Sequence, residues 1–123
     1  RLVNKVTSTC LEQDIDHKNI ELTGHSLGGA VALIVGALMV RDEIPPKQIV
    51  TFGAPRCGRL KILDTVPVTQ YRHGKDIVPV LGMCRRHNKL VEFGERESAI
   101  KDHYMLNYVK MKKLPEVTWP LNS

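Results

Sequence analysis

The sequence predicts an α/β fold, with a mostly parallel sheet of about four strands flanked by helices. Short apolar and β-branched runs, typical of strands, lie at residues 20–23, 47–52, 66–72 and 89–93. Helical patterns precede and follow the first of these runs. The 123 residues suffice for one hydrophobic core but are few for a complete enzyme of this architecture. We therefore expect a single domain over residues 1–123 that forms part of a larger α/β architecture.

The first helical pattern covers residues 1–13 and is amphipathic. Its apolar positions follow a three-to-four spacing: Leu2, Val6, Cys10 and Leu11. The second pattern, residues 27–41, is apolar nearly all the way round, which is typical of a buried helix. It ends before Pro45 and Pro46, because consecutive prolines cannot continue a helix. Since this helix joins two strands, we expect a βαβ unit with parallel strands and a right-handed crossover.

The sequence of the second half of the chain predicts short connections between the strands and a final helix. A short helix at residues 59–65 leads to the third strand, and a basic loop leads to the fourth. The final helix is expected over residues 98–113, with an apolar stripe made of Ile100, Tyr104, Tyr108 and Met111. Ligands of open α/β sheets bind at the carboxyl ends of the strands, so we expect the functional residues along that edge.

Residues 24–28 read Gly-His-Ser-Leu-Gly, a G-x-S-x-G motif placed between a strand and a helix. In this context the motif predicts a tight, strained turn that exposes the hydroxyl of Ser26 as a nucleophile. Gly24 and Gly28 approach each other across such a turn, so we expect a Cβ at either position to collide. The N–H of Leu27, directly after the serine, is expected to donate a hydrogen bond to an oxyanion. The alternative is that Ser26 only caps the helix.

Two downstream residues are candidates to complete a catalytic triad with Ser26. Asp76 follows the third strand at the same sheet edge, where a carboxylate could orient a histidine. The alternative is a turn aspartate that follows Gly74. His103 is expected near the N-terminus of the final helix, where the helix dipole disfavours the protonated ring. The alternative is a partly buried histidine bonded to the backbone, with Asp102 as the helix N-cap.

The other four histidines are weaker candidates. His25 adjoins the serine but is expected to point away from it on the tight turn. His17 is expected at the surface, His73 precedes the candidate acid, and His87 lies in the basic loop. No His/Cys cluster has the spacing of metal ligands, so neither a metal nor a cofactor is expected.

The charge of the chain is unevenly distributed. The net charge is +5, and residues 56–123 hold thirteen basic against seven acidic side chains. Such an excess can attract an anionic lipid surface, although a solvated surface is the commoner explanation. No basic segment is interleaved with aromatic residues, which argues against nucleic-acid binding.

The cysteines and the apolar runs bear on location. Cys10, Cys57 and Cys84 cannot all pair within the chain, which favours a reducing compartment. The first residues have no apolar segment of a signal peptide, and no run of about 18 apolar residues could span a membrane. From these features we expect a cytoplasmic location.

Four blocks of the sequence resemble the class 3 lipases, an α/β-hydrolase group that acts on acylglycerols and related lipid esters. Residues 22–30 resemble that family's nucleophile elbow, 50–56 the strand and loop that follow it, 72–79 the acid-bearing segment, and 102–108 the histidine block. The resemblance implies a partial α/β-hydrolase fold with Ser26 as nucleophile, Asp76 as acid and His103 as base, in the chain order of that superfamily. Family members are usually at least twice this length. Their upstream part would supply further strands, a lid and the second oxyanion donor.

The function predicted from these features is a serine ester hydrolase that acts on lipid esters, acylglycerols or phospholipids, through an acyl-enzyme. Two alternatives remain open. One is a non-catalytic hydrolase-fold fragment that acts as an interaction or lipid-surface module, and the other is a serine peptidase or thioesterase on the same fold. An exposed sheet edge would also favour pairing with a missing upstream segment or with another subunit.

Overall fold

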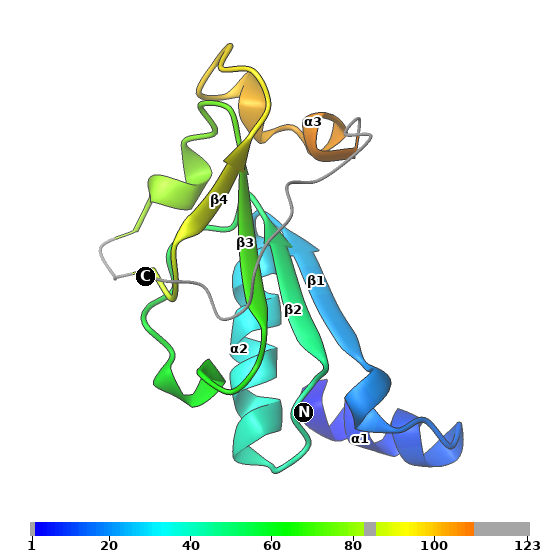
Figure 1. Ribbon diagram of the computed structural model, residues 1–123. Helices are drawn as coiled ribbons and strands as arrows, with labels where there is room; N and C mark the ends of the chain where they lie inside the picture. The colour runs from blue at the N-terminus through cyan, green and yellow to red at the C-terminus, as the bar shows by residue number, and fades with distance from the viewer. Residues whose placement is uncertain (1, 83–85, 110–123) are drawn as a thin grey trace.

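The computed structural model describes residues 2–82 and 86–109, and the centre of this part is a parallel sheet of four strands (Figure 1). The strands are β1 (Glu21–His25), β2 (Gln48–Phe52), β3 (Val68–His73) and β4 (Leu90–Phe93). Their order in the sheet follows their order in the chain, and each neighbouring pair is parallel. All carboxyl ends therefore lie along one edge, and the predicted fold class is confirmed.

The helix α2 (Leu27–Arg41) connects β1 to β2 and covers one face of the sheet (Figure 1). Between them lies an aliphatic core formed by Ala32, Leu33, Ile49, Leu63, Val66 and Val68. Leu63 comes from a short 3-10 turn, η2 (Lys61–Leu63), which is all that forms of the helix expected over residues 59–65. This core fixes α2, and with it the turn at the start of the helix, against the strands.

The N-terminal helix, α1 (Leu2–Glu12), forms where it was predicted and packs beside α2. Its predicted apolar stripe is wrong at two positions, because Leu2 and Leu11 are exposed and Val3 is the buried residue. Val3 of α1 is buried in one cluster with Val35 and Met39 of α2. Within the residues that the structure describes, no helix is both long and apolar enough to cross a membrane.

Aromatic side chains cover the other face of the sheet near its carboxyl edge. Tyr71 and Phe93, from β3 and β4, are buried together with Tyr108 of α3 (Met105–Val109). The ring centroids of Phe93 and Tyr108 are 5.5 Å apart in an edge-on arrangement. Figure 1 shows α3 at the carboxyl ends of the strands, so this cluster holds the last described segment over the edge of the sheet where ligands are expected.

One face of α2 differs from the prediction. The bounds agree with the expected helix at residues 27–41. However, Leu27, Val31 and Ile34 are 71%, 43% and 47% exposed, because the sheet covers only one side of the helix and α1 packs elsewhere on it. The expectation of burial on all sides is therefore wrong for this face.

The final helix is shorter than predicted and is interrupted. A 3-10 turn, η4 (Lys101–His103), precedes α3, and Tyr104 between them has an extended backbone with ψ 133°. Ile100 and Tyr104 are exposed while Tyr108 is buried, so the predicted apolar stripe is wrong. Met111 and the remainder of the predicted helix lie outside the described residues.

Candidate active site

Ser26 lies at the apex of the turn between β1 and α2, with φ 56° and ψ −128°. This backbone conformation is strained for a residue with a Cβ and persists only where the surrounding structure holds it. A hydrogen bond from the Ser26 N–H to the Phe52 carbonyl, 3.0 Å long, ties the turn to β2. The Ser26 side chain makes no capping bond to α2. The predicted strained turn is confirmed, and the alternative of a simple helix cap is not.

The two glycines of the motif behave differently. A Cβ at Gly24 would collide with the carbonyl of Gly28, so this position requires glycine as predicted. A Cβ at Gly28 would meet nothing within 4 Å, and the expected collision at this position is wrong. The close approach is between the backbone of Gly28 and the α-carbon of Gly24, so it restricts only one of the two residues.

The structure brings together the three residues that the sequence proposes for a triad. The Nδ1 atom of His103 donates to Asp76 Oδ2 at 2.9 Å, and its Nε2 atom lies 2.8 Å from Ser26 Oγ. A carboxylate can only accept, so the ring proton is placed on Nδ1 and Nε2 is left to accept from the serine hydroxyl. His103 belongs to η4, not to the N-terminus of a longer helix, so the expected influence of a helix dipole on its ring is wrong.

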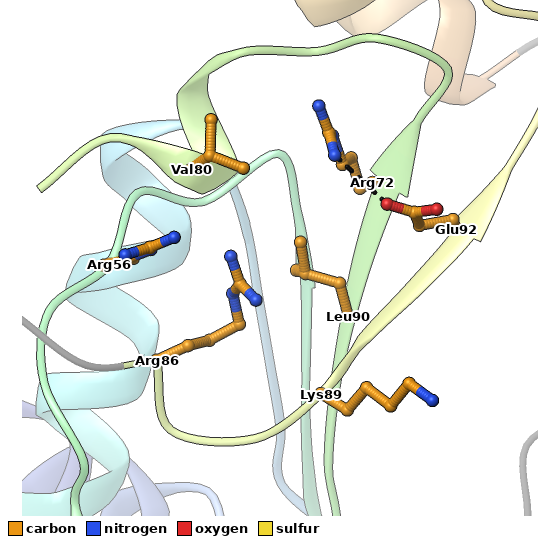
Figure 2. Close-up of a pocket in the computed structure, with 7 residues that line it drawn as sticks. All are labelled: Arg56, Arg72, Val80, Arg86, Lys89, Leu90 and Glu92. Atoms are coloured by element: carbon orange, nitrogen blue, oxygen red, sulfur yellow. Dashed lines mark hydrogen bonds and ion pairs between the residues drawn. The ribbon is translucent and has the colours of Figure 1, made fainter. Parts of the chain in front are cut away.

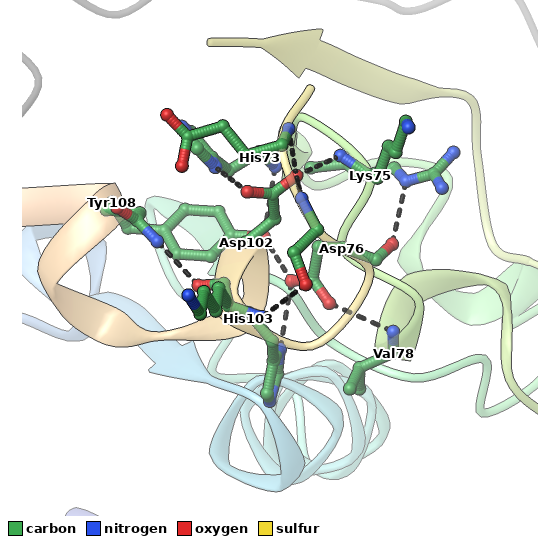
Figure 3. A network of polar contacts seen from close by, with 12 residues as sticks. His73, Lys75, Asp76, Val78, Asp102, His103 and Tyr108 are labelled. Atoms are coloured by element: carbon green, nitrogen blue, oxygen red, sulfur yellow. Dashed lines mark hydrogen bonds and ion pairs between the residues drawn. The ribbon is translucent and has the colours of Figure 1, made fainter. Parts of the chain in front are cut away.

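The Asp76 carboxylate is completely buried and fully bonded (Figure 3). Besides His103, its Oδ2 atom accepts from the Tyr108 hydroxyl at 2.5 Å, and its Oδ1 atom accepts from the Val78 N–H at 2.9 Å. Burial, followed by the bond to Asp76, raises the pKa of Tyr108 well above its ordinary value, so the hydroxyl stays protonated and remains a donor. A buried charge needs partners of this kind.

Gly53, in the loop after β2, lets these groups come together. Its φ is +63°, and a Cβ there would lie 2.6 Å from Asp76 Oδ2 and 3.1 Å from His103 Nδ1. Any larger residue would push the carboxylate and the ring apart. Sequence reasoning gave Gly53 no role, although it lies within the second of the blocks quoted above.

Leu27 begins α2 directly after Ser26. The first N–H groups of a helix have no hydrogen-bond partner within the helix, so the Leu27 N–H is available as the oxyanion donor that the sequence predicts. Its role stays a prediction.

Comparison with protein families decides where this chain belongs. The model of the family described as lipase (class 3) matches residues 2–86, more than half of the chain. The chain belongs to the class 3 lipase family. The matched region contains the turn of Ser26 and also Asp76, whereas His103 lies beyond it.

Two relatives of this class 3 lipase chain carry lipase names. It is 31% identical over 112 residues to a chloroplastic phospholipase A1 of Arabidopsis thaliana, covering 81% of this chain and 17% of that protein. It is 42% identical over 65 residues to a secreted mono- and diacylglycerol lipase of Fusarium solani, covering 49% of this chain and 19% of that protein. The chain thus spans about a fifth of the length of these relatives or less.

A solved structure shows the same fold. The Lip2 lipase of Yarrowia lipolytica superposes with a TM-score of 0.55 at 24% identity, over 73% of this chain and 36% of that one. The class 3 lipase chain therefore forms part of an α/β-hydrolase fold.

His25 lies against His103. Its Nε2 atom donates to the backbone carbonyl of His103 at 2.8 Å, and the two rings are stacked with centroids 4.7 Å apart. The ring that bonds to the Ser26 hydroxyl is that of His103, and the contact between the two histidines was not predicted. In this class 3 lipase chain the residue before the serine holds the segment that carries the histidine.

Asp102 also departs from the prediction. It does not cap a helix that starts beside it; its buried Oδ2 atom accepts from the N–H groups of Lys75, Glu97 and Ser98. Burial raises the pKa of Asp102, but these three donors outweigh it and the pKa lies below its ordinary value. The residue before His103 thus ties together the loops that follow β3 and β4.

Two of the remaining histidines, His17 and His87, bond to backbone groups. The His17 ring donates to the Pro45 carbonyl, in keeping with the absence of a predicted role. His87 is buried, and its Nδ1 atom accepts from the Leu60 N–H at 3.3 Å. Burial, and then the charge of Arg59, lower the pKa of His87, so the neutral form that this bond requires is favoured. Among the residues of the described ranges, no group of three or more His, Cys, Asp or Glu side chains could hold a metal ion.

Proposed function

We propose that this chain carries the site of a serine ester hydrolase that acts on lipid esters, either acylglycerols or phospholipids. The continuous contact from Ser26 Oγ through the His103 ring to Asp76 Oδ2, with steps of 2.8 and 2.9 Å, carries this proposal. Both steps lie within the range in which a nucleophile, a base and an orienting acid act together.

In the proposed reaction His103 Nε2 takes the hydroxyl proton while Ser26 Oγ attacks the carbonyl carbon of the ester. The Asp76 carboxylate holds the ring and stabilises the imidazolium that forms. Negative charge collects on the carbonyl oxygen, where the Leu27 N–H and the N-terminus of α2 are expected to stabilise it. The imidazolium then gives its proton to the leaving alcohol. Water, deprotonated by the same ring, hydrolyses the acyl-enzyme and releases the acid.

The surface next to the site supports an apolar acyl group. Large apolar side chains of the segments that follow Ser26 and His103 are exposed: Leu27, Tyr104, Met105, Leu106 and Val109, between 42% and 71%. Exposed apolar side chains that gather near a site are typical of contact with apolar ligands or membranes. This surface, together with relatives named as a phospholipase A1 and a mono- and diacylglycerol lipase, favours lipid esters over peptide amides or thioesters.

Labelling with a fluorophosphonate probe, followed by intact-mass measurement, tests the nucleophile and the base. We expect one adduct on the unaltered chain, none on Ser26→Ala, and a strongly slowed reaction on His103→Ala. His17→Ala is the matched control, since that ring bonds only to the Pro45 carbonyl among described groups, and it should label at the normal rate. No adduct on a chain that circular dichroism shows to be folded would favour a non-catalytic interaction or lipid-surface module.

A substrate panel tests the lipid class. Short- and long-chain glycerol esters and a phospholipid would be compared with a thioester and a peptide amide that have similar acyl groups. We expect the long-chain esters to give the highest kcat/KM. Preference for the peptide amide would contradict the proposed substrate.

We also propose that a further strand pairs with β1, from another segment of the protein or from another subunit. In the described sheet β1 has only β2 as a neighbour, which leaves a row of unpaired backbone groups. Sedimentation equilibrium over a range of concentrations should show dimers if the partner is another subunit. A monomer at every concentration would contradict pairing between subunits.

A further inference from the structure

A cavity of about 570 Å³ opens beside β3 and β4 and includes none of the triad candidates in its lining (Figure 2). Its walls are formed by Arg56, Arg72, Val80, Arg86, Lys89, Leu90 and Glu92. Four of these side chains are cationic and one is a carboxylate. The excess of basic residues noted in the second half of the sequence is thus partly gathered into one hollow.

The hydrogen bonds leave two of the arginines without an acidic partner among the described residues. Arg72 uses Glu92, at 3.1 Å, and the Asp76 carbonyl, at 2.8 Å. Within the described ranges, Arg86 donates only to the Pro79 carbonyl, at 3.1 Å, and the buried Nε atom of Arg56 has no partner. Figure 2 shows Arg56 and Arg86 extending from different walls toward the same space.

The cationic side chains of the cavity outnumber its single carboxylate, so their positive charge is not fully balanced. Burial, and then repulsion from Arg56 and Arg72, lower the pKa of Arg86, and the opposing effect of Glu92 is smaller. Like charges that are held together in a partly buried hollow are unfavourable unless an anion joins them. An unpartnered buried N–H in such a place also calls for an acceptor.

We propose that this cavity binds a phosphate group, presented either by a phospholipid head group or by a soluble phosphate ester. Guanidinium groups bind phosphate oxygens through pairs of parallel hydrogen bonds, and the free donors of Arg56 and Arg86 face one space. Val80 and Leu90, which line the cavity from different elements, offer apolar contacts for the carbon atoms of an ester. The volume lies in the range of small-molecule sites and exceeds what a lone phosphate ion needs. The site goes beyond the proposed hydrolysis and does not depend on it.

Binding of glycerol 3-phosphate, measured by isothermal titration calorimetry, tests the site directly. Sodium chloride of matched ionic strength serves as the blank. We expect Arg56→Gln and Arg86→Gln to weaken binding about tenfold or more, since each substitution removes a guanidinium group that can form two charged hydrogen bonds to the phosphate. Arg96→Gln is the matched control, because Arg96 is exposed and lies outside the cavity, and it should bind as the unaltered protein does. Equal affinity in Arg56→Gln and the unaltered protein would overturn the proposal.

A second measurement needs no variant and so does not depend on whether the variants fold. Arginines of the unaltered protein would be modified with phenylglyoxal and located by peptide mass spectrometry, with and without glycerol 3-phosphate. Protection of Arg56 and Arg86, but not of Arg96, is expected. Equal modification with and without the ligand would contradict phosphate binding in the cavity.

Vesicles distinguish the two sources of the phosphate. Flotation with phosphatidylglycerol vesicles would be compared between the unaltered protein, Arg56→Gln and Arg96→Gln. Reduced flotation of Arg56→Gln alone identifies a lipid head group as the natural source. Equal flotation of all three, together with binding of glycerol 3-phosphate, identifies a soluble phosphate ester.

Discussion

Two aspartate–histidine pairs lie side by side at the carboxyl edge of the sheet (Figure 3). In the first pair, Asp76 and His103 share a 2.9 Å hydrogen bond, and the other ring nitrogen faces Ser26. In the second pair, Asp102 Oδ1 lies 3.9 Å from His73 Nδ1, and this buried ring nitrogen has no hydrogen-bond partner among the described residues.

The difference lies in what each carboxylate and each ring already bind. Asp102 spends its Oδ2 atom on three backbone N–H groups, and the His73 ring packs against Phe93 and Tyr108 with centroids 5.3 and 5.9 Å away. Asp76 Oδ2 instead accepts from both the His103 ring and the Tyr108 hydroxyl, whereas the Oδ1 atom of Asp102 stays 3.9 Å from the His73 ring nitrogen. The same two residue types thus form the pair of the proposed triad in one place and a structural contact in the other, and their surroundings differ accordingly.

The largest expected difference between the pairs concerns the histidines. His103→Ala should lower kcat/KM for a fluorogenic ester by a factor on the order of 10⁵ to 10⁶, as losing the base of a triad does. His73→Phe keeps the ring contacts and should change kcat/KM by less than about tenfold, because this ring faces no nucleophile. Initial rates over a range of ester concentrations measure both. If folded His73→Phe lost as much kcat/KM as His103→Ala, the assignment of a purely structural role to the second pair would be contradicted.

The aspartates should differ by a smaller factor. Asp76→Asn keeps the size of the side chain but presents an amide to His103 and favours the wrong ring tautomer, so kcat should fall by about 10⁴. Asp102→Asn should lower kcat by less than about tenfold, since its oxygen can still accept from the backbone donors. Single-turnover rates at saturating ester separate this effect on chemistry from substrate binding. Similar losses in the two variants would mean that Asp102 contributes to the reaction directly.

Tyr108 connects the two pairs, because its hydroxyl donates to Asp76 and accepts from the backbone N–H of His73 at 3.0 Å. Tyr108→Phe removes one donor from a buried carboxylate and should lower kcat by about tenfold, the equivalent of about 1.4 kcal/mol. Tyr104→Phe is the matched control, since Tyr104 is 58% exposed and has no side-chain bond among the described contacts. An unchanged kcat in Tyr108→Phe would show that the remaining bonds suffice to hold Asp76.

The parts of this site that the sequence predicts are those encoded over short stretches of chain. The strand, turn and helix around Ser26 follow from a continuous pattern, and Asp76 follows from the end of a strand. The contact from His25 to His103 joins residues 78 apart, and no local pattern specifies it. Tyr108 was expected in an apolar stripe because its helical spacing indicates a buried side chain. The spacing does not indicate which group its hydroxyl would bond to, so the contact with Asp76 was not predicted.

The final helix shows why a periodic pattern can fail. Residues 98–113 have helical spacing, but Asp102 accepts from N–H groups of the loops that follow β3 and β4. The chain therefore forms only the short 3-10 turn η4 before Tyr104. Tertiary hydrogen bonds to a buried charge outweigh a helix propensity of a few tenths of a kcal/mol per residue. The cavity lined by arginines could not be predicted from the sequence either, since its arginines come from three separate segments of the chain.

The last prediction concerns stability and tests the structural role of the second pair, Asp102 and His73. The folded-state pKa of Asp102 lies below its value in the unfolded chain, which is about 3.9. The ionised carboxylate therefore stabilises the fold above that value, and this contribution is lost as the pH falls from about 4 through the folded-state pKa. Asp102→Asn should lower the free energy of unfolding at pH 7 by about 1–3 kcal/mol, because three bonds to a charged acceptor become bonds to a neutral one. Urea unfolding from pH 7 to pH 3 should show the difference between the two proteins shrinking below pH 4. A difference that stayed constant over this range would mean that packing, and not the charge of Asp102, holds the loops together.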